Sequence, residues 1–509
     1  MDSVADPSVA VPRTMASVPR DLRTRIVSGM RWTVWLSVLA VPFSFGTNAI
    51  LARTGPEAIG TYGLLAVYIG LVAAFFYLGG DPVIIKFIPE LGPEKRLSFL
   101  FSYFLVVGAT LCLWLAVVLK WPDKLHYLFG DKGGPSFYVL ALCLSPIYIL
   151  FSMAVAALKG LLEIRWAQSL MRAMNIGSFC IYGMLFLFAR ASLVAHYKVW
   201  IWGIYLALTT ILMGLGACRL VSITTSHRNR PRLDFYLPRG FWKYALATQQ
   251  LSAVGFFINR LDYILVLNFG SLETLGKYVA ISTIATLIPL ANTFFLDTLL
   301  PSLTNLVALH NLPAASEVFS LYMRVLFLVN TMTTCGLMLL ASMLTKMFGP
   351  KYSSLEVPII AAVLLTGLAS PGAVGSTLLS SIGKQQRGVF VGTGQVILYC
   401  LLFYLMWPHL HLLGAVIASG VATCLSYLAL LTVAERSVPM RVSVAKDYLA
   451  FALVAIGTAS TSLVLKGSLN ALVAPLWMTA MVVFMLLAGY RAAECRELAR
   501  CFLPEWATS

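Results

Sequence analysis

The chain has few charged residues and many apolar ones. Asp, Glu, Lys and Arg make up 11% of its 509 residues, against about 25% in an ordinary soluble domain. Hydrophobic residues reach 59%, and the mean hydropathy is +0.84. A chain of this length would otherwise form several soluble domains, but so few charges cannot cover their surfaces. The composition therefore excludes a soluble protein.

Sequence motifs of catalysis and energy coupling are also missing. The chain has no GxxxxGK[ST], because Gly383-Lys384 is followed by Gln385, and it has no HExxH, DxD or GxSxG. Its nine cysteines form no CxxC and accompany no histidine cluster, which argues against a disulfide framework or a zinc site. We expect no enzyme, no cofactor, no metal and no direct use of ATP. A membrane glycosyltransferase or polymerase would need a carboxylate constellation on one face.

Apolar runs near 20 residues long recur along the whole chain, as in an all-α polytopic membrane protein. We predict fourteen transmembrane helices. They cover residues 30–51, 60–79, 98–119, 136–158, 167–189, 199–218, 244–269, 278–301, 325–345, 357–380, 388–407, 412–434, 447–465 and 470–490.

The basic residues give this arrangement an orientation. With the N-terminus in the cytosol, 25 of the 37 Lys and Arg residues fall in inner segments, 10 in outer segments and two inside spans. Lys and Arg concentrate in short cytoplasmic loops, so both termini are expected in the cytoplasm. The net charge of +16 then reflects orientation near anionic lipid, and no nucleic-acid partner is expected.

An internal repeat divides the chain. Glu57-Ala-Ile-Gly60-Thr-Tyr62 matches Glu273-Thr-Leu-Gly276-Lys-Tyr278 at an offset of 216 residues, and Asp81 falls on Asp297. Two parallel six-helix lobes follow from this repeat, with two helices appended. The predicted parts are a cytosolic tail (1–27), an N-lobe (28–221), a cytosolic linker (222–240), a C-lobe (241–434), spans 13 and 14 (447–490) and a cytosolic C-terminal tail (491–509).

The seventh span carries a polar stripe. At 100° per residue its polar side chains share one face, which predicts that this face lines a cavity. The stripe consists of Thr248, Gln249, Ser252, Asn259, Arg260 and Tyr263. Asp262 lies about 200° from Arg260 and cannot be its simple partner within the helix. Arg260 therefore contacts an anion in the cavity, forms a salt bridge to another helix, or lies nearer a span end than predicted.

Polar residues in three other spans complete the predicted site. Thr286 and Asp297 share a face of the eighth span with Pro289. Asp297 and Asp262 are candidates for ion coupling, although capping or structural pairing is the simpler interpretation of each. Arg172 either faces the cavity or extends to the cytosolic surface. Asn48 follows Pro42, which predicts a kink in the first span.

Several of these segments resemble a known family. Leu51-Ala-Arg-Thr-Gly55-Pro-Glu57, Gly79-Gly-Asp81 and Lys86-Phe-Ile-Pro89-Glu90 resemble prokaryotic polysaccharide transporters of the O-antigen flippase type. These transporters belong to the multidrug/oligosaccharidyl-lipid/polysaccharide exporter superfamily. The run Leu412-Leu-Gly414-Ala-Val-Ile-Ala-Ser-Gly420 fits the same pattern.

The resemblance implies two lobes around a cavity and an alternating-access flippase in the bacterial inner membrane. The implied substrate is a polyprenyl-diphosphate-linked oligosaccharide, with membrane lipids as surroundings and a polysaccharide polymerase and export proteins as partners. A lipid II flippase is the alternative, since the last two helices resemble its lipid groove. A drug or cation extruder is another. No functional residue transfers by motif, so the site prediction rests on the polar stripes.

Overall fold

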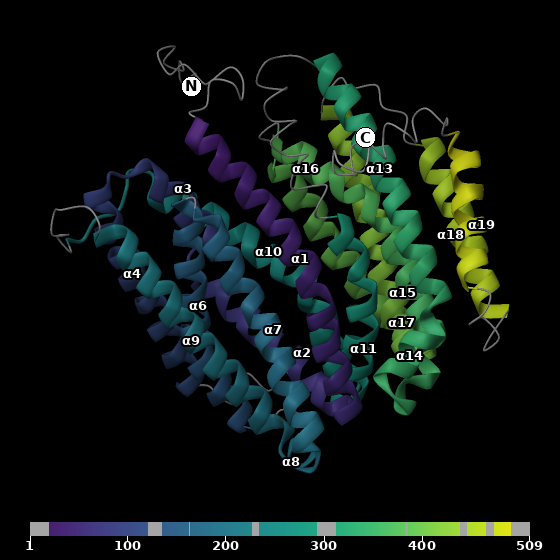
Figure 1. Cartoon of the computed structure of the whole chain (residues 1–509), viewed down its shortest axis with the longest axis horizontal. Coiled ribbons are helices and arrows are strands. Elements are labelled where there is room, and N and C mark those ends of the chain that lie inside the picture. Colours follow the sequence, from purple (N-terminus) through teal and green to yellow (C-terminus); the bar gives the residue numbers. More distant parts are fainter. Residues whose placement is uncertain are drawn as a thin grey trace. The chain divides into compact units, whose positions relative to one another are not determined.

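The structure is a computed structural model of the chain. It describes residues 20–120, 135–161, 163–225, 234–292, 312–381, 385–437, 445–464 and 473–489. These residues form helices and no strand (Figure 1). Ten stretches are long and apolar enough to cross a membrane, judged by length and composition. The all-α polytopic fold is therefore confirmed, while the count of fourteen spans stays a prediction.

The described residues form two compact units. Unit 1 holds residues 20–47, 68–120 and 135–253, and unit 2 holds residues 48–67 and 254–489. Three helices contribute to both units, namely α1 (Arg20–Thr54), α2 (Pro56–Phe76) and α10 (Phe241–Phe269). The predicted lobe boundary instead lies in the linker 222–240, so the two lobes stay a prediction. The helix α1 begins within the range predicted as a tail.

Unit 1 also contains six helices of its own. They are α3 (Asp81–Glu90), α4 (Pro93–Lys120), α6 (Pro135–Gly160), α7 (Ile164–Phe188), α8 (Arg190–Ala195) and α9 (Tyr197–Thr225). Phe87 of α3 packs against Phe99 and Phe241 with ring centroids 6.1 Å apart, and Tyr103 packs against the same two rings at 6.0–6.1 Å. This buried aromatic cluster fixes α3 and the start of α10 against α4.

Unit 2 contains the remaining helices. They are α11 (Leu272–Ala285), α13 (Leu312–Leu339), α14 (Ala341–Phe348), the 3₁₀ turns Pro350–Leu355 and Ser370–Gly372, α15 (Glu356–Ala369), α16 (Ala373–Ser381), α17 (Gln385–Ser437), α18 (Ala445–Val464) and α19 (Val473–Ala488). The helix α17 covers the predicted spans 11 and 12 and contains a kink at His411, where φ is +46°. Each of the fourteen predicted ranges overlaps a described helix.

Prolines shape two of the predicted spans. Pro289 has no N–H to donate to the carbonyl of Ala285, and α11 ends at Ala285. The chain continues past this break, since the N–H of Leu290 donates to the carbonyl of Thr286 at 3.2 Å. Pro42 lies inside α1, which continues past it to Thr54, so the predicted kink stays a prediction.

Candidate functional site

The first half of the α10 stripe belongs to unit 1, and its polar groups bond to backbone. The side-chain amide of Gln249 donates to the carbonyl of Ala74, and its oxygen accepts the N–H of Gly79. Gly79 has φ +84°, so the chain turns sharply there and leaves the end of α2 with free backbone groups. Gln249 satisfies two of these groups. Thr248 donates to the carbonyl of Tyr244 at 2.8 Å, and Ser252 is half-buried.

The second half of the stripe belongs to unit 2 and presents a cation. The guanidinium carbon of Arg260 lies 5.4 Å from the ring centroid of Tyr263. Within the described residues, no carboxylate lies at ion-pair distance from Arg260. Asn259 is exposed and donates to the carbonyl of Gly255 at 2.7 Å, within its own helix. Arg260 therefore offers hydrogen-bond donors without a structural salt bridge in this part of the chain.

Asp262 makes its hydrogen bonds in a polar cluster, and among the described residues it forms no ion pair with Arg260. The hydroxyl of Tyr278 on α11 donates to Asp262 Oδ2 at 2.8 Å, and the N–H of Tyr263 donates to Oδ1 at 2.9 Å. A small cavity of about 10 Å³ adjoins the carboxylate. It is lined by Phe257, Ile258, Asp262, Gln395, Val396, Tyr399, Ser419, Ala422 and Thr423.

The polar residues that α17 contributes to this cavity were not predicted from the sequence. Gln395 donates to the hydroxyl of Thr423 at 3.1 Å. The buried hydroxyl of Tyr399 has no hydrogen-bond partner. One turn separates Gln395 from Tyr399, and one turn separates Ser419 from Thr423, so each pair places polar groups on one helix face. This spacing was the available signal in spans 11 and 12.

Two further predicted residues, Asn48 and Thr286, each bond to Thr283 in unit 2. Asn48 of α1 donates to the hydroxyl of Thr283 at 3.3 Å, and its buried Oδ1 has no hydrogen-bond partner. Thr286 is exposed and donates to the carbonyl of Thr283 at 2.9 Å. The contact joins the end of α1 to α11, and it leaves one acceptor of Asn48 for a ligand or water.

The last two predicted residues lie elsewhere. Arg172 is half-buried on α7 of unit 1, one turn from Gln168, whose buried Oε1 has no hydrogen-bond partner. Asp297 lies outside the described residues. The described part of the chain also shows no group of three or more His, Cys, Asp or Glu side chains placed to hold a metal ion.

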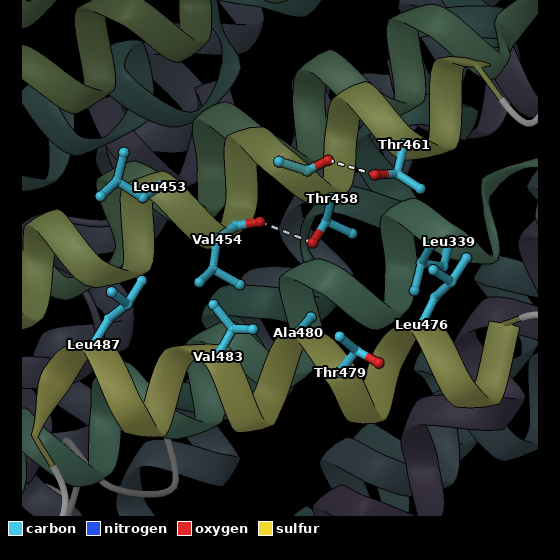
Figure 2. A pocket seen from close by; sticks show the side chains of 11 residues that line it. Leu339, Leu453, Val454, Thr458, Thr461, Leu476, Thr479, Ala480, Val483 and Leu487 are labelled. Atoms are coloured by element: carbon cyan, nitrogen blue, oxygen red, sulfur yellow. Dashed lines mark hydrogen bonds between the residues drawn. The ribbon is translucent and has the colours of Figure 1, made fainter.

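An apolar groove lies within unit 2, among α13, α18 and α19 (Figure 2). Its volume is about 330 Å³, in the range of small-molecule sites. The lining residues are Leu339, Leu453, Val454, Gly457, Thr458, Thr461, Leu476, Thr479, Ala480, Val483 and Leu487. All three threonine hydroxyls donate at 2.8 Å to a carbonyl one turn earlier in their own helix. The groove therefore presents hydrocarbon.

No protein-family model and no curated protein sequence matches the chain. Solved structures do match it. A lipid II flippase, MurJ, in an inward closed conformation aligns with a TM-score of 0.66 and 14% identity, over 92% of this chain and 99% of its own. An inward-facing multidrug resistance MATE family transporter of the MOP superfamily aligns with a TM-score of 0.63 and 13% identity, over 80% and 98%.

A third structure is a MOP superfamily transporter from Pyrococcus furiosus, described by the reverse polarity of its binding pocket. It aligns with a TM-score of 0.55 and 14% identity, over 81% of this chain and 94% of its own. At such identities the likeness concerns the fold. Together with the apolar helices, it shows that the chain is a multi-pass membrane protein with the fold of MOP superfamily transporters and flippases.

Proposed function

We propose that the chain is a flippase for a polyprenyl-diphosphate-linked oligosaccharide, the repeat unit of an O-antigen, capsule or exopolysaccharide. It moves this lipid from the cytosolic to the outer leaflet of the bacterial inner membrane by alternating access, with both termini in the cytoplasm. The lipid-linked oligosaccharide and membrane lipids are its direct partners. A polysaccharide polymerase and export proteins act on the product.

The environment of Arg260 is the main support for this proposal. It lies in a helix apolar enough to span a membrane, and its guanidinium rests on an aromatic ring without an ion pair among the described residues. A charge in this position is costly unless it meets a counterion or water. A diphosphate supplies two anionic groups that the planar guanidinium binds through paired hydrogen bonds.

Other polar groups of unit 2 suit the sugar part of the substrate. Asn48 has a buried acceptor without a partner, and Asn259 and Thr286 are exposed. Amides and hydroxyls of this kind exchange hydrogen bonds with sugar hydroxyls. Arg172, Gln249 and Ser252 belong to unit 1, and we keep them in the proposed cavity wall. Gln249 is the weakest member, because its amide already bonds to backbone.

A cation at Asp262 is part of the same proposal. A carboxylate, three hydroxyls and a side-chain amide line a cavity with room for one water-sized particle. Oxygen ligands of this type suit a small hard cation. Binding there would couple transport to an ion gradient. Asp297 stays a second candidate for this role.

A lipid II flippase is the alternative that a specific observation favours. The MurJ structure covers 92% of the chain, against 80% for the MATE transporter, and the groove among α13, α18 and α19 suits a hydrocarbon tail. Both flippase substrates share a polyprenyl diphosphate, so Arg260 and the groove fit either one. A drug or cation extruder is the third candidate, and a cationic residue at the site speaks against it.

The proposal is tested by expressing variants in a strain that lacks the native protein and measuring glycan export. Arg260→Ala should abolish glycan export at near-normal protein abundance, and Arg260→Lys should restore only part, because a point charge cannot form the paired bonds. Lys243→Ala, an exposed base at the start of α10, serves as the control. Full export by Arg260→Ala would reject the role of Arg260, and loss of the protein itself would indicate a structural role.

Reconstitution separates the three substrates. Proteoliposomes should flip a labelled lipid-linked oligosaccharide in preference to labelled lipid II, and they should not accumulate a cationic dye. Preference for lipid II, or uptake of the dye, would replace the proposed substrate by the corresponding alternative.

A further inference from the structure

A chain of side-chain contacts through two tyrosines connects Arg260 to the carboxylate of Asp262. Arg260 and Tyr263 are three residues apart on α10 and therefore share a face, whereas Asp262 faces α11 and α17. The ring of Tyr263 meets the ring of Tyr278 edge to face, with centroids 5.7 Å apart and an interplanar angle of 90°. The Tyr278 hydroxyl then donates to Asp262 Oδ2 at 2.8 Å. All four residues belong to unit 2.

The two rings have little freedom to move independently. Tyr278 is 3% exposed. On the neighbouring helix α2, a Cβ at Gly63 would lie 2.5 Å from Val279 and 3.5 Å from the Tyr263 ring. The half-buried ring of Tyr263 thus packs against both α2 and α11, at a point where a residue larger than glycine would press on Val279. A change in the position of one ring must be met by the other, because closely packed side chains shift together.

We infer that Tyr263 and Tyr278 couple the anion-binding position at Arg260 to the cation cavity at Asp262. The inference rests on the proposed function, and it assigns positioning roles to two residues outside the ligand contacts. A cation in the cavity binds the Asp262 carboxylate, which also accepts the hydrogen bond from Tyr278. The cation therefore weakens this hydrogen bond. Tyr278 then holds the Tyr263 ring less firmly, and Arg260 leaves the ring for the anion more readily.

The coupling acts in both directions. An anion that draws Arg260 away from Tyr263 frees the two rings, and cation binding at Asp262 then disturbs fewer contacts. Linkage requires that each ligand changes the affinity of the other by the same factor. The direct alternative, attraction between the two bound ions, needs neither tyrosine.

The experiment measures binding of farnesyl diphosphate to the purified full-length protein. Binding is titrated in Na⁺ and, at the same ionic strength, in N-methylglucamine, and the ratio of the two dissociation constants gives the coupling factor. In the wild type we expect tighter binding in Na⁺, by a factor of about 5 to 150. Tyr278→Phe keeps the ring but loses the hydroxyl, and Tyr263→Leu loses the ring. Each should reduce the factor to about twofold or less.

Two controls accompany these variants. Tyr263→Phe keeps the ring under Arg260 and should keep the coupling factor. Tyr352→Phe removes a buried hydroxyl of the same unit that has no hydrogen-bond partner, so it should match the wild type. If Tyr278→Phe fails to fold, Tyr263→Leu still decides the question, because it breaks the same connection on α10.

Each contrary outcome has a distinct meaning. A wild-type protein that does not bind farnesyl diphosphate overturns the proposed function and this inference with it. Binding that is independent of Na⁺ overturns the coupling but leaves the anion site in place. A coupling factor that persists in both Tyr278→Phe and Tyr263→Leu overturns the role of the tyrosines and favours direct attraction between the bound ions.

Discussion

Gly60 and Gly276 lie against each other where α2 and α11 begin. A Cβ on Gly60 would lie 3.1 Å from the nitrogen of Gly276, and one on Gly276 would lie 3.2 Å from the nitrogen of Gly60. These glycines are equivalent positions of the internal repeat. The internal repeat therefore brings two equivalent glycines together in one helix contact of unit 2.

Gly276→Ala should destabilise the protein. The new Cβ would overlap the carbonyl of Pro56, which belongs to backbone and cannot turn aside as a side chain does. We expect a loss of about 1–3 kcal/mol, the usual cost of overpacking, seen as a lower melting temperature in detergent. Gly55→Ala is the matched control, since a Cβ there meets nothing within 4 Å. Equal melting temperatures for both variants would show that α2 and α11 are not in close contact.

Gln249→Leu tests whether that amide stabilises the fold or binds substrate. Leucine leaves the carbonyl of Ala74 and the N–H of Gly79 without their partner, at an expected cost of about 1–3 kcal/mol. Asn259→Ala loses only a bond within its own helix at an exposed position and should leave the melting temperature unchanged. A stable Gln249→Leu protein with impaired substrate binding would instead place Gln249 in the cavity wall.

Asp81→Asn should reduce the dependence of stability on pH. Asp81 opens α3, which is not among the candidate membrane spans, and burial raises the pKa of its carboxyl although Tyr77 and Lys159 lower it. The native state then keeps this proton at a pH where the unfolded chain has lost it, so stability falls as the pH rises above the ordinary value of 3.8.

Asparagine can still accept the 2.9 Å hydrogen bond from Tyr77 but has no proton to lose. As the pH rises above 3.8, the melting temperature of Asp81→Asn should therefore fall less than that of the wild type. Asp234→Asn, at an exposed position, is the control. Parallel pH profiles for wild type and Asp81→Asn would contradict the burial of this carboxyl.

Ala480→Phe should fill the groove among α13, α18 and α19. Ala480 lines the groove, so a phenyl ring there takes the volume that a hydrocarbon tail would occupy. Flipping of the labelled lipid in proteoliposomes should decline at unchanged protein abundance. Met478→Phe places the same ring at a position that is 61% exposed and outside the groove lining, and it should flip normally. Normal flipping by Ala480→Phe would remove the groove from the substrate path.

The helices of this protein could be predicted from its sequence because long apolar runs determine them almost alone. The Gly60–Gly276 repeat was also visible, since it depends on local identities and spacing. The separation of Arg260 from Asp262 followed from helix geometry. In each case the information lies within one segment of the chain.

The hydrogen bonds of Gln249 to backbone groups and the cavity beside Asp262 could not be predicted in this way. The partners of Gln249 are backbone groups of α2 and of the turn after it, more than 160 residues earlier, and backbone groups leave no mark in the sequence. The spacing of Gln395 and Tyr399, and of Ser419 and Thr423, could be seen in the sequence. That these pairs lie beside Asp262 depends on how α10 packs against α17, which the sequence pattern does not reveal. By contrast, the end of α11 at Ala285 could have been predicted from the position of Pro289 alone.

The three threonines of the groove do not fix the position of a hydrocarbon tail along it. Their hydroxyls are engaged within their own helices, so a hydrocarbon can slide along α18 and α19 without breaking a directional bond. A surface of this kind holds a tail by contact area and does not distinguish one isoprene unit from the next. In the proposed flippase, discrimination among lipid carriers must then come from the head group, and carriers of different length should be transported alike.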